Sequence, residues 1–217
     1  SCIMLAGRTS IPDVFSAINC FKKQTWPYRE LIIVNNAKNQ FLASDLNIHA
    51  EPDIFIIDTP FHLSAGMARN YGIAAANGQI LAQFDPDYWY APNRLASQIG
   101  TLANNESQVV ILAKTIKYSF GSGRASYQTN DKEAILNTMV FVRPAKIDYP
   151  NVEKQEEFGI LERLQQAGAK PISMSVPELA CKLYLTSGKR IFKPTNNGLS
   201  NQHFKLIKQI VKDHRNQ

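Results

Sequence analysis

The sequence predicts an α/β fold with a mostly parallel central sheet. The chain opens in the order strand, helix, strand, which is typical of parallel sheets because parallel strands need a crossover connection. Its hydrophobic runs are short, and residues 31–34 and 54–57, for example, are four residues long. A membrane span needs roughly 20 apolar residues, so the sequence predicts no transmembrane helix. Of the 217 residues, 44% are hydrophobic and 19% are charged, which excludes a disordered chain.

The first half of the chain alternates strands and helices. Apolar residues at helical spacing, with Pro12 in the first turn, predict a helix over residues 11–23. A helix over residues 64–77 is rich in alanine, and Gly78 is its expected C-cap. Short buried runs predict the strands over residues 1–5, 30–34, 53–57 and 79–84.

The second half continues the pattern. Helices are expected over residues 92–104, over 156–167 with Gly168 as the closing residue, and over 204–211 with Phe204, Ile207 and Val211 on one stripe. Strands are expected over residues 109–117, 136–143, 172–175 and 181–185. A polar stretch rich in glycine and serine, residues 118–131, is interpreted as a loop.

The positive charge is concentrated near the C-terminus. Residues 181–217 hold eight Lys or Arg and one acid, whereas the whole chain has a net charge of +6. A nucleic-acid enzyme usually spreads its basic residues over the fold, so no nucleic-acid partner is expected. The tail is interpreted either as a helix packed on the body or a partner domain, or as a peripheral contact with anionic membrane.

The cysteines favour a reducing compartment. Cys2, Cys20 and Cys181 are odd in number and widely spaced, so neither a disulfide framework nor a metal-binding pair is expected. We therefore expect a cytoplasmic protein. The chain begins at Ser1 without an initiator Met, so a larger polypeptide remains open, as does a homo-oligomer.

Asp85 and Asp87 are the first candidates for chemistry. They follow a predicted strand at its carboxyl end, where open α/β sheets bind ligands. Two carboxylates two residues apart can share a divalent cation, although many such pairs are solvated turns. The aromatics that follow, Tyr88, Trp89 and Tyr90, are placed in a loop and form either a core anchor or a stacking platform for a sugar.

Two further pairs carry alternative interpretations. Glu156 and Glu157 begin a predicted helix, where acids are favoured by the positive helix end, and where a carboxylate could also take a proton from an acceptor hydroxyl. Asn35 and Asn36 follow a buried strand. They are either simple turn residues or amide groups that hydrogen-bond to a nucleobase.

The order of these features resembles glycosyltransferase family 2, of the GT-A fold, to about residue 186. Residues 1–8 and 24–37 (QTWPYRELIIVNNA) match the family's opening phrases. Residues 68–73 (ARNYGI), 76–80, 84–87 (FDPD) and 92–95 match its central motif, and residues 156–164 (EEFGILERL) match its E-D helix. The resemblance implies a GT-A, Rossmann-like α/β/α sandwich.

The resemblance also implies roles for individual residues. Asp87 matches the metal-coordinating acid, and Asp85 matches an acid near the donor ribose and the metal. Glu157 matches the catalytic base of inverting members, Glu156 is its neighbour, and Arg69 lies near the donor pocket. The implied reaction moves a sugar from a nucleotide-diphosphate donor to a hydroxyl acceptor, with Mn²⁺ or Mg²⁺ as the cofactor. The acceptor is expected in cell-surface polysaccharide or glycan synthesis, either as a glycan or as a lipid-linked molecule.

Three departures weaken the expected donor pocket. Ala6 and Gly7 replace an aromatic that commonly lines the base pocket, and Asn35 and Asn36 replace two acids. Residues 180–188 (ACKLYLTSG) lack the family's frequent histidine. A UDP-sugar is favoured as the donor, with Ala6, Asn35, Asn36, Arg69 and Asp85 as its expected contacts and Tyr88 and Trp89 on the acceptor side.

Two alternatives remain open at this point. One is a GT-A fold that serves as a non-catalytic binding or scaffolding module. The other is a nucleotidyltransferase, which would need a glycine-rich basic loop that residues 5–10 lack. The expected organisation is a transferase domain over residues 1–186, divided near residue 95 into donor and acceptor halves. Residues 187–217 would form a basic extension. The acceptor loops are expected at residues 118–131 and 151–155.

Overall fold

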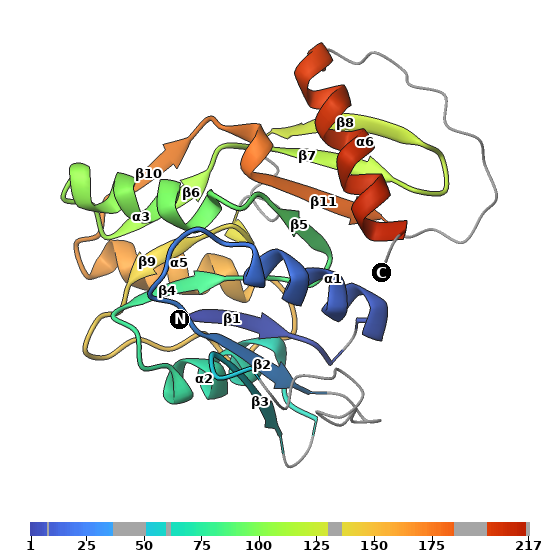
Figure 1. The fold of residues 1–217 in the computed structure, drawn as a ribbon. Helices are drawn as coiled ribbons and strands as arrows, with labels where there is room; N and C mark the ends of the chain where they lie inside the picture. The colour runs from blue at the N-terminus through green and yellow to red at the C-terminus, as the bar shows by residue number, and fades with distance from the viewer. Residues whose placement is uncertain (8, 37–50, 60–61, 130–135, 185–198, 216–217) are drawn as a thin grey trace.

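The computed structural model describes residues 1–7, 9–36, 51–59, 62–129, 136–184 and 199–215. Its main element is a seven-stranded sheet with the order β10-β6-β9-β4-β1-β2-β3 (Figure 1). Only β9 runs antiparallel to its neighbours β4 and β6, so the predicted mostly parallel sheet is confirmed. The strands are β1 (Cys2–Leu5), β2 (Leu31–Asn35), β3 (Ile54–Asp58), β4 (Ile80–Gln83), β6 (Val109–Leu112), β9 (Val140–Val142) and β10 (Pro171–Met174).

Helices cover both faces of this sheet. Helices α1 (Ile11–Lys22) and α3 (Arg94–Asn104) share one hydrophobic cluster with the strands, and α2 (Ala65–Ala75) and α5 (Glu156–Gln166) share the other. Successive strand residues point to opposite faces. Met4 therefore packs in the first cluster and its neighbour Ile3 in the second. This is the expected α/β/α sandwich.

A second sheet of four strands was not predicted. It has the order β5-β11-β7-β8, formed by β5 (Tyr88–Tyr90), β11 (Ala180–Tyr184), β7 (Lys114–Ser119) and β8 (Arg124–Thr129). A short 3₁₀ helix, η2 (Pro177–Leu179), precedes β11. Helix α6 (Asn201–Arg215) lies over this sheet at the upper right of Figure 1 and buries Ile207 and Ile210 against it. The stripe of the predicted C-terminal helix therefore packs on the body.

Three element predictions were wrong in detail. The expected strand over 109–117 is two strands in different sheets, which separate at Ala113. The expected loop over 118–131 contains β8, and the aromatic run forms β5 instead of a loop. Strands β5 and β7 are fixed by pairing with the distant strand β11, which local composition does not reveal, whereas β8 forms a hairpin with β7 that the polar composition of the segment concealed.

Most helix ends agree with the sequence, but α6 extends beyond the predicted 204–211 at both ends, and one predicted glycine cap is wrong. Ser10 caps α1 by accepting a hydrogen bond from the Asp13 N–H, and Gly168 follows α5 with a φ of +93°. Helix α2, however, ends at Ala75 with Ala76 as its C-cap. Gly78 lies beyond the helix, and its N–H donates to the Ser1 hydroxyl at 2.8 Å.

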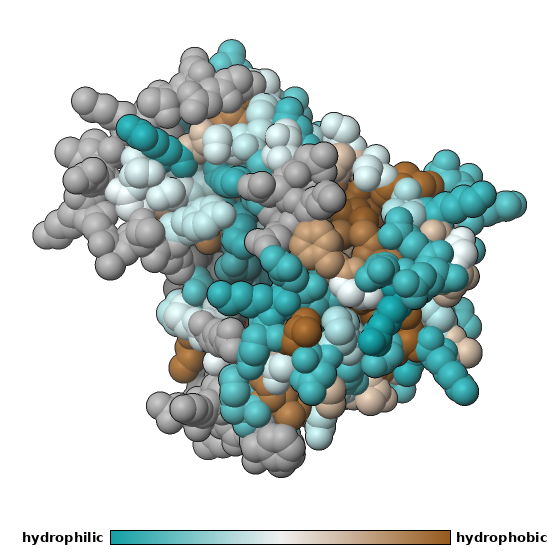
Figure 2. All heavy atoms as spheres, turned by 180° about the vertical axis from the view of Figure 1, so that it is seen from behind, coloured by the Kyte–Doolittle hydropathy of each residue, from teal (hydrophilic) through white to brown (hydrophobic). Residues whose placement is uncertain are grey.

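Hydrophilic side chains cover much of the face shown in Figure 2, where the described residues also form one continuous hydrophobic patch right of the centre and smaller ones below it. The hydrophilic cover agrees with the burial of the large apolar side chains between the layers. In the described part of the chain, none of the helices combines the length and apolar character that a membrane crossing requires.

Candidate active site

The site forms where several parallel strands end. Ala6 follows β1, Asn36 follows β2, and Asp85 follows β4. Strands β2, β1 and β4 are neighbours in that order and run parallel, so these three residues lie at one edge of the sheet. The carboxyl edge of such a sheet is the usual place for a ligand.

Arg69 joins three of the predicted site acids. Its side chain is 4% exposed, and its Nη2 donates to Asp85 Oδ1 at 3.1 Å and to Glu157 Oε1 at 3.2 Å. Its Nε donates to Glu156 Oε1 at 3.0 Å. The three acids come from two places far apart in the sequence. We call Arg69, Asp85, Glu156 and Glu157 the acid cluster.

The loop before α5 brings this helix to Arg69. Asn70 of α2 accepts from the Tyr149 N–H at 2.7 Å and donates to the Tyr149 carbonyl at 3.0 Å. A Cβ at Gly66 would lie 1.8 Å from the Pro150 carbonyl oxygen, so only glycine permits this approach. Helix α5 then begins with its two glutamates in the first turn, where the helix dipole favours negative charge.

Burial gives Glu157 an unusual acidity. Burial raises its pKa to about 7, against the opposing influence of Arg69, and the nearby charges of Glu156 and Asp85 add to the rise. A carboxylate with a pKa near neutrality can accept a proton and still be ionised at working pH. Glu157 is therefore suited to general-base work.

Asn35 and Asn36 both bond within the protein. Asn35 Nδ2 donates to Asp58 Oδ1 at 2.7 Å. Asn36 Oδ1 accepts from the Leu63 N–H at 2.7 Å and from the Thr59 hydroxyl at 3.2 Å, and its Nδ2 donates to the Leu63 carbonyl at 2.6 Å. These bonds hold residues 59 and 63 against the end of β2. The predicted contact between these amides and a nucleobase stays a prediction.

A small cavity of about 80 Å³ lies beside Asn36. Leu5, Gly7, Thr9 and Ala65 form the rest of its lining. Ala6 lies between two of these lining residues in the chain and is buried. This cavity occupies the sheet edge where the donor base was predicted.

Asp87 is not a member of the acid cluster and pairs with a different cation. Its side chain is 43% exposed, and its Oδ2 lies 3.3 Å from Lys182 Nζ of β11. Burial raises the pKa of Asp87, and the Lys182 charge opposes that rise. Burial lowers the pKa of Lys182, but nearby negative charges, led by that of Asp87, hold this pKa above its usual value. Each group thus opposes the effect of burial on the charged form of the other.

The aromatic run serves mainly as a core anchor. Tyr88 is fully buried and stacks on Tyr90, with ring centroids 5.7 Å apart and planes 10° apart. Its predicted place in an acceptor platform is corrected, because a buried ring has no face open to a sugar. Trp89 is partly buried against two hydrophobic clusters, and its acceptor role stays a prediction.

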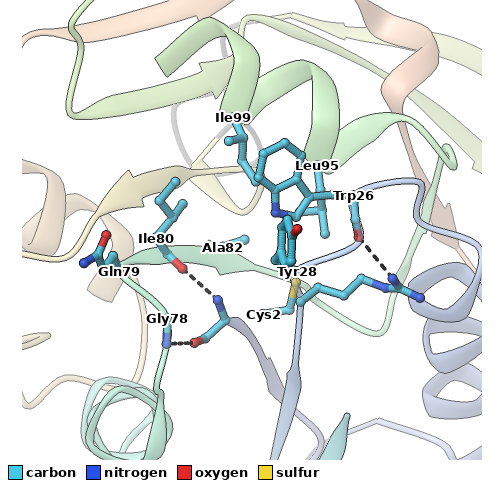
Figure 3. A pocket seen from close by; sticks show the side chains of 11 residues that line it. Cys2, Trp26, Tyr28, Gly78, Gln79, Ile80, Ala82, Leu95 and Ile99 are labelled. Carbon is cyan, nitrogen blue, oxygen red and sulfur yellow. Dashed lines mark hydrogen bonds between the residues drawn. The ribbon is translucent and has the colours of Figure 1, made fainter. Parts of the chain in front are cut away.

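A larger cavity of about 230 Å³ lies away from these residues (Figure 3). It opens where β1 begins, at Ser1 and Cys2, whereas the acid cluster lies beyond the other end of β4. Trp26, Leu95 and Ile99 point into it, and the Ser1 ammonium donates to the Ile80 carbonyl at 2.7 Å on its floor. It contains none of the predicted site residues.

Sequence reasoning missed two contributors. Lys182 was counted only among the basic residues of the C-terminal segment and within a stretch that lacks histidine, although a charged residue within a predicted strand was a usable signal. Tyr149 was not considered, yet its ring lies 5.7 Å from the Arg69 guanidinium carbon and its hydroxyl accepts from Gln83 Nε2 at 2.9 Å. No local pattern distinguishes it.

Together, the layered sheet and the acids at its carboxyl edge define a GT-A-type fold, and solved structures share it. TarS 1–349 of S. aureus in complex with UDP-GlcNAc matches with a TM-score of 0.62 and 15% identity over 98% of this chain and 65% of that one. The mannosyltransferase PcManGT from Pyrobaculum calidifontis, in complex with GDP-Man and Mn²⁺, matches with a TM-score of 0.61 and 14% identity over 98% of this chain and 61% of that one. GalNAc-T7 with UDP, GalNAc and Mn²⁺ matches with a TM-score of 0.66 and 13% identity over 97% of this chain and 47% of that one.

The chain belongs to glycosyl transferase family 2, whose sequence profile it matches over residues 12–157. This confirms the family that the motifs indicated. No curated protein matches the chain. The chain spans 65% or less of the length of the structures named above, and at 13–15% identity their likeness concerns the fold.

Proposed function

We propose that the chain transfers a sugar from a nucleoside-diphosphate sugar to an acceptor hydroxyl, with inversion at the anomeric carbon. The observation that carries the proposal is the position of Glu157, which is buried, bonded to Arg69 and raised in pKa to about 7. Family membership supports a nucleotide-sugar donor. A UDP-sugar remains the favoured donor.

In this proposal Glu157 is the general base. The acceptor oxygen forms a bond to the anomeric carbon, and the bond from that carbon to the diphosphate breaks, with its electron pair leaving on the diphosphate. The proton of the hydroxyl passes to the Glu157 carboxylate. Arg69 holds Glu157 beside Asp85, and accurate placement matters because a shift of roughly 1 Å can cost about a hundredfold in rate.

The predicted metal site fits these residues poorly. Asp85 bonds to Arg69, and Asp87 pairs with Lys182. Among the described residues, there is no group of three His, Cys, Asp or Glu side chains arranged to hold a metal ion. A divalent cation at Asp87 would have to displace an ammonium from 3.3 Å away. The metal roles of Asp85 and Asp87 stay predictions that the donor set does not favour.

The acceptor is proposed to be a glycan or a lipid-linked hydroxyl of cell-surface glycan synthesis. Residues 151–155 precede the two glutamates in the chain, which supports a role in acceptor binding. Residues 118–129 lie in the second sheet, and 130–131 are outside the described residues. Lys189, Arg190 and Lys193 of the basic tail also lie outside the described residues.

A peripheral membrane contact is proposed through the outer face of α6. Lys205, Lys208 and Lys212 are exposed on this helix, while its apolar stripe packs on the second sheet. Each lysine near an anionic surface can contribute about 1 kcal/mol. The boundary between the transferase domain and the basic extension, near residue 186, is likewise a proposal. Sedimentation with anionic liposomes at low salt tests the contact, and no sedimentation would overturn it.

A thermal-shift panel tests the proposed function. The purified chain is heated with UDP, GDP, dTDP or CMP and with their common sugars, in the presence of Mn²⁺ or of EDTA. One nucleotide is expected to raise the unfolding temperature, because a ligand that binds only the native state stabilises it. If no nucleotide or sugar does so in a folded sample, the non-catalytic scaffold becomes the better interpretation.

Glu157→Gln then separates binding from chemistry. It should leave the nucleotide-induced shift unchanged and lower sugar transfer by about 10²–10⁴-fold, as expected on loss of a general base. The control is Glu162→Gln on the same helix, which is expected to leave both unchanged because Glu162 is exposed on α5.

A further inference from the structure

The main chain fixes Lys182 beside Asp87. Strand β11 runs antiparallel to β5, with Lys182 opposite Tyr88. The Leu183 N–H donates to the Asp87 carbonyl at 2.8 Å, so a backbone hydrogen bond ties the two strands at this point. The sheet register therefore fixes the backbone of Lys182 next to Asp87, within reach of its side chain.

Aromatic rings and one carboxylate surround the ammonium. Nζ lies 3.3 Å from Asp87 Oδ2, 5.3 Å from the centre of the Tyr88 ring and 5.9 Å from that of Tyr184. An aromatic face within about 6 Å attracts a cation. The lysine side chain is 21% exposed, so a solute can still reach it. Its charge is held in place and remains accessible.

We propose that Lys182 takes the place of a divalent cation and meets the donor diphosphate beside Asp87. The inference rests on the proposed function. The Lys182 ammonium can donate hydrogen bonds to phosphate oxygens and neutralise the charge that the diphosphate gains as it departs. Asp87 acts as a positioning residue for this lysine. Nucleoside diphosphate binding then needs no divalent metal.

Three features favour this assignment over the alternative, in which a divalent cation binds Asp87 and displaces the Lys182 ammonium. The register of β11 fixes Lys182 at Asp87. The other acid of the predicted metal pair, Asp85, is bonded to Arg69. The Lys182 ammonium lies 3.3 Å from Asp87 Oδ2 and also faces two aromatic rings. A metal ion bound to Asp87 would be a second cation close to this ammonium, and the two like charges would repel each other.

Calorimetric titration of the full chain with UDP, GDP and dTDP tests the proposal. For the nucleotide that binds, we expect Kd values in EDTA and in Mn²⁺ to agree within about twofold. Lys182→Met in EDTA should weaken binding by about tenfold or more, since a charge-assisted hydrogen bond to phosphate is lost. Lys182→Arg should retain most of the affinity because it retains the charge.

Lys114→Met is the matched control. It removes the same charge from β7 of the same sheet, but Lys114 Nζ lies over the Tyr127 ring at 3.6 Å, and Tyr127 pairs with Ile116 on the face that α6 covers. Its Kd should equal that of the wild type. In Lys182→Ala, Mn²⁺ should restore part of the lost binding, because the vacated place beside Asp87 can then accept a cation.

The outcomes separate the two proposals. If wild-type binding requires Mn²⁺, or if Lys182→Met binds as tightly as the wild type in EDTA, Lys182 does not replace a metal and the transferase proposal stands. If no nucleoside diphosphate binds in either condition, both proposals fail. Should Lys182→Met not fold, the wild-type comparison of EDTA with Mn²⁺ still decides the question.

Discussion

Two buried arginines serve opposite purposes in this fold. Arg69 of α2 meets three carboxylates, from Asp85, Glu156 and Glu157. Arg94 of α3 is fully buried, and within the described part of the chain it has no carboxylate in contact. Its Nη2 donates to the Gln83 carbonyl at 2.8 Å and to the Thr138 carbonyl at 3.2 Å, and its Nε donates to Gln98 at 2.9 Å.

The difference shows how one residue type organises either charge or packing. The Arg94 guanidinium lies 4.1 Å from the centre of the Tyr90 ring, so backbone carbonyls and an aromatic face stabilise its charge. Such contacts tie β4, the segment just before β9, and α3 together. Arg69 instead contacts three acids, among them Glu157, whose pKa burial raises to about 7, and this suits a reaction that moves a proton. We expect Arg94 to matter for stability at any pH and Arg69 to couple stability to pH.

Arg69→Ala should have the largest effect on this comparison. It leaves three carboxylates buried without their cation, which should cost about 3–5 kcal/mol of unfolding free energy near pH 8. At pH 5 the cost should be smaller, because Glu157, whose pKa burial raises to about 7, is then protonated. Urea unfolding at both pH values measures it, and equal losses at the two pH values would contradict the charge role.

Arg94→Ala should destabilise by about 3 kcal/mol, through unsatisfied carbonyls and a cavity. The loss should be the same at pH 5 and pH 8, since no described carboxylate contacts this arginine. The same urea series measures it. A strong dependence on pH would mean that the two arginines do not differ as the structure indicates.

Glu157→Gln should flatten the pH dependence of stability. In the native protein burial raises the Glu157 pKa to about 7, above its usual value near 4.5. The native state then holds a proton that the unfolded chain releases, so stability falls as pH rises from about 4.5 to 7. The variant lacks this loss, on the order of 1–3 kcal/mol. Parallel slopes for the two proteins would place the raised pKa elsewhere.

Gly100→Ala is the smallest test and compares the helices of the two regions. A Cβ at Gly100 of α3 would meet nothing within 4 Å, so the variant should be stabilised by about 0.5–1 kcal/mol. Gly159→Ala in α5 should instead destabilise by about 1–3 kcal/mol, because its Cβ would lie 2.5 Å from Pro150 Cγ. Thermal unfolding measures both. A stabilised Gly159→Ala would show that the acid cluster tolerates movement of its helix.

Much of the fold could be read directly from the sequence. The strand–helix–strand opening, the acids after β4 and the E-D helix are local patterns, and their order along the chain is typical of the family. Helix α5 begins at Glu156, where its acids predicted a helix start, and Gly168 follows it with a positive φ. Such features depend on neighbours in the chain.

Other parts of the molecule depend on contacts between distant residues. The sequence by itself determined the α/β class, the family and the residues of the acid cluster, because periodicity and motif order are properties of adjacent positions. Only the tertiary structure decided that Arg69 binds Glu156 87 residues away, that Tyr88 is buried in a second sheet, and that Lys182 stands against Asp87. Strand pairing and burial decide which side chains meet, and both are set by the whole chain at once.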